Sequence, residues 1–243
     1  MGTFLVHKNK GGSLHMLNKI IQGDCLEVMK NIPDKSVDLV VTDPPYLMGY
    51  QSGWRKQKFE KIIGDRMGEK ENEELIIETV KQCERVMKDD TAIYMFCSWH
   101  NVDFFKKEFQ KQFKLKNIIV WVKNNHGSGD LKGSYAPKHE LILFGHKGRS
   151  LNRGKRMADV VLFDKVSGGK MLHPTEKPID LLETIINNSS DKENVVLDMF
   201  AGSGTTAVAC LNTNRNFIGI EQEQKYVDIA NERIEETLNV IGS

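Results

Sequence analysis

The sequence predicts an α/β protein built on a mostly parallel β-sheet that is covered by helices on both faces. Short apolar segments alternate with segments of helical periodicity along nearly the whole chain. Several of the apolar segments are continuous, as expected of strands that are buried on both faces. Two of them end in an acid that is followed at once by a turn, at Asp43 and at Asp198. A chain of 243 residues suits one such domain.

In the first half of the chain, residues 36–43 form a continuous apolar run that ends in an acid, which predicts a buried strand. Residues 71–88 have apolar side chains at helical spacing and acids in the first turn, which predicts a helix. On the same grounds, strands are expected at 18–24, 91–98, 115–123 and 139–147, and helices at 25–32 and 101–113. Residues 47–70 are polar and lack a period, so they are predicted to be a long loop.

The second half continues the alternation after an irregular segment at residues 147–172, which is basic at its start. Pro178 predicts the start of a helix, because its missing N–H would have no partner at the first helical position. The expected helices are 178–190, 204–212 and 224–238, and the expected strands are 194–198 and 216–221.

The composition limits the class of protein. The formal net charge is +1, so any contact with nucleic acid must come from local patches. The cysteines at 25, 83, 97 and 210 lack metal-ligand spacing and are predicted to be buried thiols in a reducing cytoplasm. No apolar run approaches the roughly 20 residues that span a bilayer, and no signal peptide is visible. Residues 1–15 are predicted to be a tag or flexible arm beside a single domain at 16–243.

A glycine-containing turn lies between the strand expected at 194–198 and the next helix. Gly202 and Gly204 fit the dinucleotide-binding pattern, and Glu221 stands where an acid that binds a ribose is expected. A tight turn without a ligand would also explain the glycines. Asp198 favours one class of ligand, because its carboxylate would repel a pyrophosphate and attract a cation. We therefore expect S-adenosylmethionine, which is cationic and carries no phosphate, with Glu221 accepting hydrogen bonds from the ribose hydroxyls.

Asp43 is followed by Pro44, Pro45 and Tyr46, which form a stiff corner. Both prolines have a fixed φ and donate no N–H, so a strand-ending turn is one interpretation. A second interpretation is chemical. The Asp43 carboxylate and the Pro44 carbonyl could accept both N–H groups of a nucleobase amine, while Tyr46 offers a flat face to a base taken out of the duplex. Two acceptors would free the nitrogen lone pair, and the carboxylate would stabilise the positive charge that develops there.

With both sites in view, the chain resembles the DNA amino-methyltransferases, the enzymes that make N6-methyladenine or N4-methylcytosine. The resemblance covers nearly all of residues 17–238. The motifs that carry it are, in chain order, IIQGDCLEVM, DPPY, WVKNN, HELILFGHK, HPTEKP, DMFAGSGTT and FIGIE. DPPY is similar to the catalytic motif of this family, and DMFAGSGTT is similar to its cofactor loop.

The resemblance implies a Rossmann-like methyltransferase fold with a seven-stranded, mostly parallel sheet. It also implies the circularly permuted motif order of the family's β group, because the catalytic corner precedes the cofactor loop. The implied catalytic residues are Asp43, Pro44, Pro45 and Tyr46. The implied cofactor-binding residues are Asp24, Cys25, Asp43, His173, Lys177, Asp198, Phe200, Ala201, Gly202, Ser203, Gly204, Thr205, Thr206, Glu221 and Gln222. S-adenosylmethionine is the implied cofactor, and no metal is expected.

The reaction implied by the resemblance is site-specific methyl transfer to the N6 amine of adenine in DNA, by base flipping and direct in-line attack. Asp at the first position of the corner is commoner in the adenine enzymes of this family. N4-cytosine methylation is the main alternative. Methylation of RNA or of a protein amide and an inactive DNA-binding homologue are weaker ones. DNA is the implied partner, and a homodimer and a cognate restriction endonuclease are compatible with the family.

Two basic segments are candidates for DNA contact, because cations that touch phosphates provide affinity. A solvated basic loop is the alternative for each. The predicted contacts are Trp54, Arg55, Lys56, Lys58, Arg149, Arg153, Lys155 and Arg156. Target recognition is assigned to short insertions at about 47–70 and 147–172. Because the second insertion is short for this family, either the recognised site is short or both insertions share in reading it.

Overall fold

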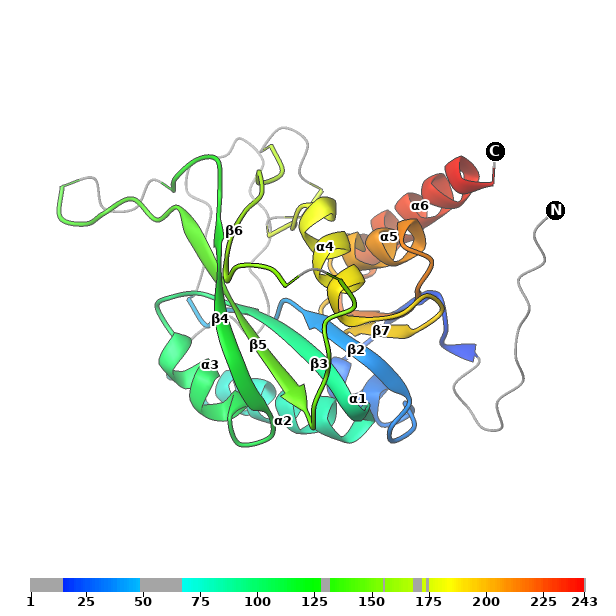
Figure 1. Cartoon of the computed structure of the whole chain (residues 1–243), viewed down its shortest axis with the longest axis horizontal. Helices are drawn as coiled ribbons and strands as arrows, with labels where there is room; N and C mark the ends of the chain where they lie inside the picture. The colour runs from blue at the N-terminus through cyan, green and yellow to red at the C-terminus, as the bar shows by residue number, and fades with distance from the viewer. Residues whose placement is uncertain are drawn as a thin grey trace.

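A computed structural model describes residues 15–48, 67–127, 132–154, 156–167, 172–173 and 175–242. These residues form an eight-stranded sheet in the order β1-β8-β7-β2-β3-β5-β4-β6, shown in Figure 1. The strands are β1 (Lys19–Gln22), β2 (Val37–Thr42), β3 (Met87–Cys97), β4 (Lys114–Val122), β5 (His139–Lys147), β6 (Val160–Leu162), β7 (Val195–Asp198) and β8 (Asn216–Glu221). Neighbouring strands are parallel except for β5, which is antiparallel to both β3 and β4.

Helices cover both faces of the sheet, and each face has its own apolar core. The helices are α1 (Cys25–Met29), α2 (Lys70–Val86), α3 (Val102–Phe109), α4 (Ile179–Ser189), α5 (Thr205–Asn212) and α6 (Gln224–Ile241). Side chains of β3 alternate between the faces, as the pleat requires. Tyr94 and Phe96 pack with α4, α5 and α6, whereas Ile93 and Met95 pack with α1, α2 and α3. Both faces are therefore sealed by continuous apolar packing.

The predicted α/β fold with a mostly parallel sheet is confirmed, but the expected number of seven strands is wrong, because the described residues form eight. The eighth strand, β6, lies within the segment predicted to be irregular and pairs with Val120–Val122. A strand of three residues, within an apolar run of four between Asp159 and Asp164, is too short to give a periodic signal. A second difference is that β3 begins at Met87, directly after α2, and not at residue 91 as predicted. The early start was missed because residues 88–90 are polar. Residues 1–14 and 49–66, which include most of the arm and most of the first insertion, lie outside the described part of the chain.

The ends of the strands form two opposite borders of the sheet, which are called edges here and are distinct from its outermost strands β1 and β6. Parallel strands β2, β7 and β8 end at one of them, here called the carboxyl edge, where Asp43 and Asp198 lie. Because β5 runs in the opposite direction, its first residues, His139 and Glu140, reach the same carboxyl edge. The end of β5 lies at the opposite edge, called the amino edge, where Lys147 pairs with Thr91. Strand direction thus decides which polar residues can meet at the site.

Candidate active site

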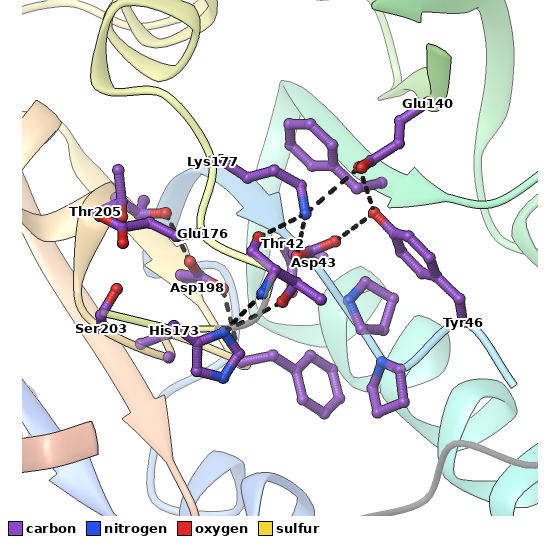
Figure 2. Close-up of a pocket in the computed structure, with 18 of the residues that line it drawn as sticks. Thr42, Asp43, Tyr46, Glu140, His173, Glu176, Lys177, Asp198, Ser203 and Thr205 are labelled. Carbon is purple, nitrogen blue, oxygen red and sulfur yellow. Dashed lines mark hydrogen bonds and ion pairs between the residues drawn. The ribbon is translucent and has the colours of Figure 1, made fainter. Parts of the chain in front are cut away.

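The corner at Asp43–Tyr46 and the glycine loop at 199–204 both open into one cavity of about 440 Å³ at the carboxyl edge. Figure 2 shows Asp43, Tyr46, His173, Lys177 and Asp198 around it. All four residues predicted to be catalytic line this cavity, as do all of the predicted cofactor-binding residues except Gly204. Two motifs that are separated by about 150 residues of sequence are therefore brought to one place by the neighbouring strands β2 and β7.

The glycine loop is shaped by backbone geometry. Gly202 has φ +50°, in the left-handed region that favours glycine, and its N–H donates to Glu221 Oε2 at 2.9 Å. A Cβ at this position would lie 3.4 Å from the His173 ring, at the cavity wall. Gly204 also has a positive φ, +77°, but a Cβ there would lie 2.7 Å from the Cβ of Ala230. Gly204 therefore serves the packing of α6 against the loop, which explains why it does not line the cavity.

Asp198 is a buried acid whose oxygens are held from two sides. Its Oδ1 accepts the Phe200 N–H at 3.1 Å, and its Oδ2 accepts the Thr206 hydroxyl at 2.6 Å. Burial raises the pKa of Asp198 to about 7, against the effect of these two donors. Glu221 is held by N–H groups of Gly202 and Glu223, and burial raises its pKa as well.

These groups fit S-adenosylmethionine better than a phosphate-bearing ligand. The buried Asp198 and the half-buried Glu221 both line the cavity, which suits a cation and disfavours a pyrophosphate. Gly202 lines the cavity without a side chain, so a ligand can approach its backbone closely. Each oxygen of Glu221 accepts one N–H and keeps a second lone pair for a hydroxyl. His173 adds no charge, because burial, together with Lys177 and Lys225, lowers its pKa to about 3.

Arg233 of α6 holds the glycine loop through hydrogen bonds and through an ion pair with Glu176. Its Nη1 donates to the Ser203 carbonyl at 2.7 Å and lies 3.1 Å from Thr205 Oγ1, while its Nη2 pairs with Glu176 at 3.1 Å. The side chains of Arg233 and Glu176 are both largely buried. The sequence contains no motif for this contact, since an arginine in an amphipathic helix is normally a surface residue.

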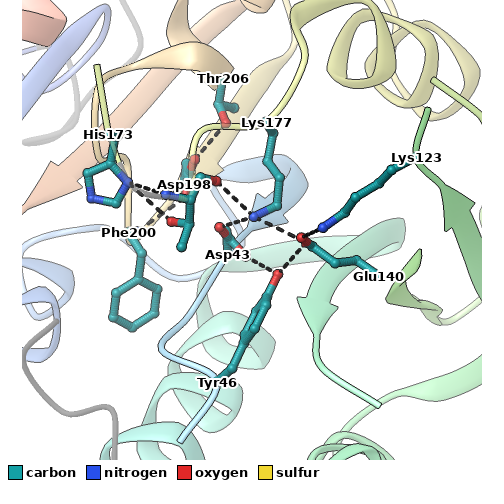
Figure 3. Close-up of polar contacts among 10 residues, drawn as sticks. Asp43, Tyr46, Lys123, Glu140, His173, Lys177, Asp198, Phe200 and Thr206 are labelled. Carbon is teal, nitrogen blue, oxygen red and sulfur yellow. Dashed lines mark hydrogen bonds and ion pairs between the residues drawn. The ribbon is translucent and has the colours of Figure 1, made fainter. Parts of the chain in front are cut away.

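The other half of the cavity contains an ion cluster, shown in Figure 3. Its members are Asp43, Tyr46, Lys123, Glu140 and Lys177. Lys177 Nζ donates to Asp43 Oδ2 and lies 3.4 Å from Glu140 Oε2, and Lys123 Nζ donates to Glu140 Oε1 at 2.5 Å. The Tyr46 hydroxyl lies 2.7 Å from Asp43 Oδ1 and 2.9 Å from Glu140 Oε2.

The structure changes the sequence-based account of this half. Lys177 lines the cavity, but its ammonium contacts the carboxylate of Asp43, and its predicted role at the cofactor stays a prediction. Glu140 and Lys123 were missed altogether. Glu140 lies in the strand predicted at 139–147, but nothing in its sequence context separates it from a surface acid. The aromatic pair Trp99 and His100, which lines the cavity with ring centroids 3.8 Å apart, was also missed.

The acid–base properties of the cluster follow from burial and from its charges. Burial raises the pKa of Asp43, and Lys177 opposes that shift. Burial alone would raise the pKa of Glu140, but Lys177 and Lys123 together lower it to about 2. Burial alone would lower the pKa of Lys177, but Asp43 and Glu140 raise it overall. At neutral pH, Glu140 is therefore a carboxylate and Lys177 an ammonium. Of the two acids, Asp43 has a higher pKa than Glu140.

The predicted DNA contacts are not brought together with the cavity. Trp54, Arg55, Lys56, Lys58 and Lys155 lie outside the described residues. Arg149, Arg153 and Arg156 are described, but they do not line the cavity. Arg149 donates its N–H to Asp90, at the start of β3, and Arg153 pairs with Asp191, just before β7. Both contacts lie at the amino edge, and the seven residue-to-residue steps of β3 from Asp90 to Cys97 span roughly 23 Å.

Two further observations concern the class of protein. No helix in the described residues is long and apolar enough to cross a membrane. Within the same residues, no group of three or more His, Cys, Asp or Glu side chains is arranged to hold a metal ion.

Comparison with known proteins gives consistent results. The DNA methylase family matches residues 37–232. The type II methyltransferase M.HinfI of Haemophilus influenzae is 32% identical, over 90% of this chain and 69% of that protein. A crystal structure of an M1.HpyAVI–SAM complex is 27% identical with a TM-score of 0.68, over 89% of this chain and 98% of that one. The cytosine-N4-specific PvuII DNA methyltransferase is 16% identical with a TM-score of 0.72, over 93% of each chain, which shows a common fold.

Proposed function

The chain belongs to the N6/N4 family of DNA methylases, and from that premise we propose that it transfers a methyl group from S-adenosylmethionine to the N6 amine of adenine in DNA. One observation carries this proposal. Asp43 and the loop at Gly202 line the same cavity, so a base amine and a methyl donor can be bound within reach of each other. Had the two motifs faced opposite sides of the sheet, direct transfer would have been excluded.

The cofactor half of the cavity would hold the cationic donor. Asp198 would attract its positive charge, Glu221 would accept hydrogen bonds from the ribose hydroxyls, and Gly202 would leave room for close approach. When bound, S-adenosylmethionine supplies an electrophilic methyl group on a sulfonium, which leaves as a neutral thioether. The neutral His173 ring, packed edge-on against Tyr226 at 4.3 Å, forms the adjoining wall.

The corner would position and activate the amine. The Asp43 carboxylate and the Pro44 carbonyl accept its two N–H groups, which localises the lone pair on nitrogen. As the N–C bond forms, the nitrogen becomes cationic and then loses one proton. The nearest base is Asp43, and burial raises its pKa toward that of a useful proton acceptor. Most of the acceleration would come from holding the two reactants in line.

Adenine is proposed over cytosine on the Asp at position 43, which is commoner in the adenine enzymes of the family. The geometry of the cavity is compatible with either base, because each carries an exocyclic amine beside a ring nitrogen. Base flipping is part of the proposal, since the reacting amine is inaccessible within a duplex. The predicted homodimer, restriction endonuclease partner and cytoplasmic location stay predictions.

The test is methyl transfer itself. The protein is incubated with methyl-labelled S-adenosylmethionine in three separate reactions, which contain duplex DNA, single-stranded DNA or RNA. The nucleic acid from each reaction is then digested to nucleosides. Label in N6-methyl-2′-deoxyadenosine from DNA is expected. Label in N4-methyl-2′-deoxycytidine would correct the base, label in RNA would correct the substrate class, and no label beside an active reference enzyme would overturn the proposal. Asp43→Asn, which retains one oxygen acceptor but no charge, is the matched inactive control.

A further inference from the structure

We propose that Lys177 and Glu140 act as a matched pair of positioning residues. Lys177 holds Asp43 in its ionised form, and Glu140 offsets part of the positive charge of Lys177, which would otherwise oppose the positive charge that develops on the base amine. This inference rests on the proposed function, because it assigns the control of its central carboxylate. The motifs that identify the chain do not contain Glu140 in a functional role, and they leave Lys177 on the cofactor side.

Lys177 is fixed at Asp43 by its surroundings. Its side chain is only 6% exposed, and its ammonium donates to Asp43 Oδ2 and to the Thr175 carbonyl at 3.0 Å. The rings of Phe96 and Tyr46 lie 5.1 and 5.5 Å from Nζ, within the range of cation–π attraction. A buried ammonium with these contacts cannot exchange them for water without a large cost. It is therefore a permanent feature of the site.

This arrangement presents an electrostatic conflict that Glu140 resolves. Burial favours a protonated Asp43, which could accept only weakly from the base amine, and an adjacent cation counters that effect. The same cation opposes the positive charge that develops on the amine nitrogen. Glu140, which lies 3.4 Å from Nζ and is 19% exposed, offsets part of the Lys177 charge. Lys123 in turn neutralises Glu140, so the cluster contains two carboxylates and two ammonium groups.

Tyr46 connects the two carboxylates and leaves room for the substrate. A carboxylate offers about four lone-pair positions, of which Lys177 and Tyr46 occupy one on each Asp43 oxygen. The remaining positions are available to the base amine. The Tyr46 hydroxyl has a single proton, which can point to Asp43 while that acid is ionised. When Asp43 takes up the proton of the amine, the hydroxyl can donate to Glu140 instead. The bridge thus accommodates both protonation states of Asp43.

A purely mechanical role is the competing explanation. The cluster joins the segment after β2, the start of β5 and the segment before α4, so its ion pairs could serve only to clamp these elements together. A clamp predicts that loss of either residue lowers stability and activity at every pH. The proposal predicts more: the two substitutions must move the titration of Asp43 in opposite directions, because Lys177 lowers the pKa of Asp43 and Glu140 raises it.

The experiment follows the Asp43 carboxyl by NMR in protein labelled with carboxyl-¹³C aspartate, with the resonance assigned by its loss in Asp43→Asn. Titrations compare wild type, Lys177→Met, Lys177→Arg and Glu140→Gln. The other titratable groups near Asp43 are Tyr46, Cys97 and Asp198, and His173 lies near Lys177. All four are retained in every variant. Lys111→Met, which removes the half-exposed lysine that pairs with the buried Glu108, is the control for loss of an unrelated lysine.

The expected midpoint for Asp43 rises in Lys177→Met, falls in Glu140→Gln and stays near wild type in Lys177→Arg and Lys111→Met. In methylation assays, the acid limb of the kcat profile moves the same way, and kcat at neutral pH falls on the order of 100-fold in Lys177→Met. Midpoints that do not move, or that move in the same direction, overturn the proposal. The NMR titration needs no turnover, so it decides the matter even if the wild-type protein transfers no methyl group to DNA, which would instead overturn the proposed function.

Discussion

The two halves of the cavity are built in different ways. The cofactor half is centred on the loop between β7 and α5, whose backbone N–H groups hold Asp198 and, at the end of the neighbouring strand β8, Glu221. The target half comes from four separate segments of the chain, and ion pairs join Asp43, Glu140, Lys123 and Lys177. The first half is therefore set by local backbone geometry, and the second depends on the whole fold. Substitutions in the two halves should therefore cause different defects, in cofactor affinity or in turnover.

Asp43→Ala is expected to have the largest effect. It removes the acceptor and base at the reacting amine, so kcat should fall by about 10³-fold or more. S-adenosylmethionine affinity, measured by calorimetry, should change little, because Asp198 and Glu221 are retained. Thermal unfolding serves as a control, since the change also leaves Lys177 without its main partner. Turnover close to that of wild type would refute the catalytic assignment.

Gly202→Val should produce the complementary defect in the cofactor half. A β-branched residue is strongly disfavoured at φ +50°, and its side chain would enter the cavity beside His173. Cofactor affinity should fall by at least about 100-fold, equivalent to roughly 3 kcal/mol. DNA binding in a gel-shift assay should persist, because the substitution lies away from Asp43 and Tyr46. Wild-type cofactor affinity in calorimetry would count against the assigned loop.

Gly204→Ala separates packing from binding within the same loop. A Cβ at position 204 would lie 2.7 Å from the Cβ of Ala230, at φ +77°, so we expect a loss of about 1–3 kcal/mol in the free energy of unfolding. Cofactor affinity of the folded protein should be nearly unchanged. Gly154→Ala is the control, because no atom lies within 4 Å of the Cβ built there. A binding defect without a loss of stability would show that Gly204 contacts the ligand after all.

Asp198 should make cofactor binding depend on pH. Its pKa is raised to about 7, so its carboxylate forms, and can attract a cation, only as the pH rises through that value. Affinity should increase about tenfold between pH 6 and pH 8 if only the ionised form binds. Stability without cofactor should change in the opposite sense. A raised carboxyl pKa gives a contribution that is lost as the pH rises from about 4, the unfolded value, toward about 7. Asp198→Asn should remove both dependences, and an unchanged pH profile in that variant would argue against this role.

The contrast between the halves also explains how far the sequence could be interpreted. The strand at 139–147 and the strand at 216–221 were predicted with their observed bounds, because apolar runs and turn residues are local signals. The cofactor loop was recognisable for the same reason. Glu140 and Lys123 were not, because their partners are distant in sequence and meet only through the antiparallel placement of β5. The strand β6 was missed because three residues are too few for a periodic pattern. The contacts of Arg233 with the glycine loop were missed because no sequence motif marks them.

The smallest effect is expected for two residues that the sequence suggested as DNA contacts. Arg149 and Arg153 lie at the amino edge, roughly 23 Å along the sheet from the cavity, and each is engaged locally. A DNA that delivers a base to the carboxyl edge should not depend on them. We expect the double variant Arg149→Gln, Arg153→Gln to retain wild-type DNA affinity and salt dependence.

The matched variant is Lys138→Gln, Lys165→Gln, which removes two cations at the carboxyl edge. Lys138 immediately precedes β5, and Lys165 lines the cavity. Each phosphate contact contributes about 0.9 to the slope of log affinity against log salt, so this variant should lose up to about 2 in slope. If instead the arginine variant loses the slope and the lysine variant retains it, the duplex crosses the amino edge. The site of DNA contact would then lie apart from the cavity, which a base-flipping enzyme could not accommodate.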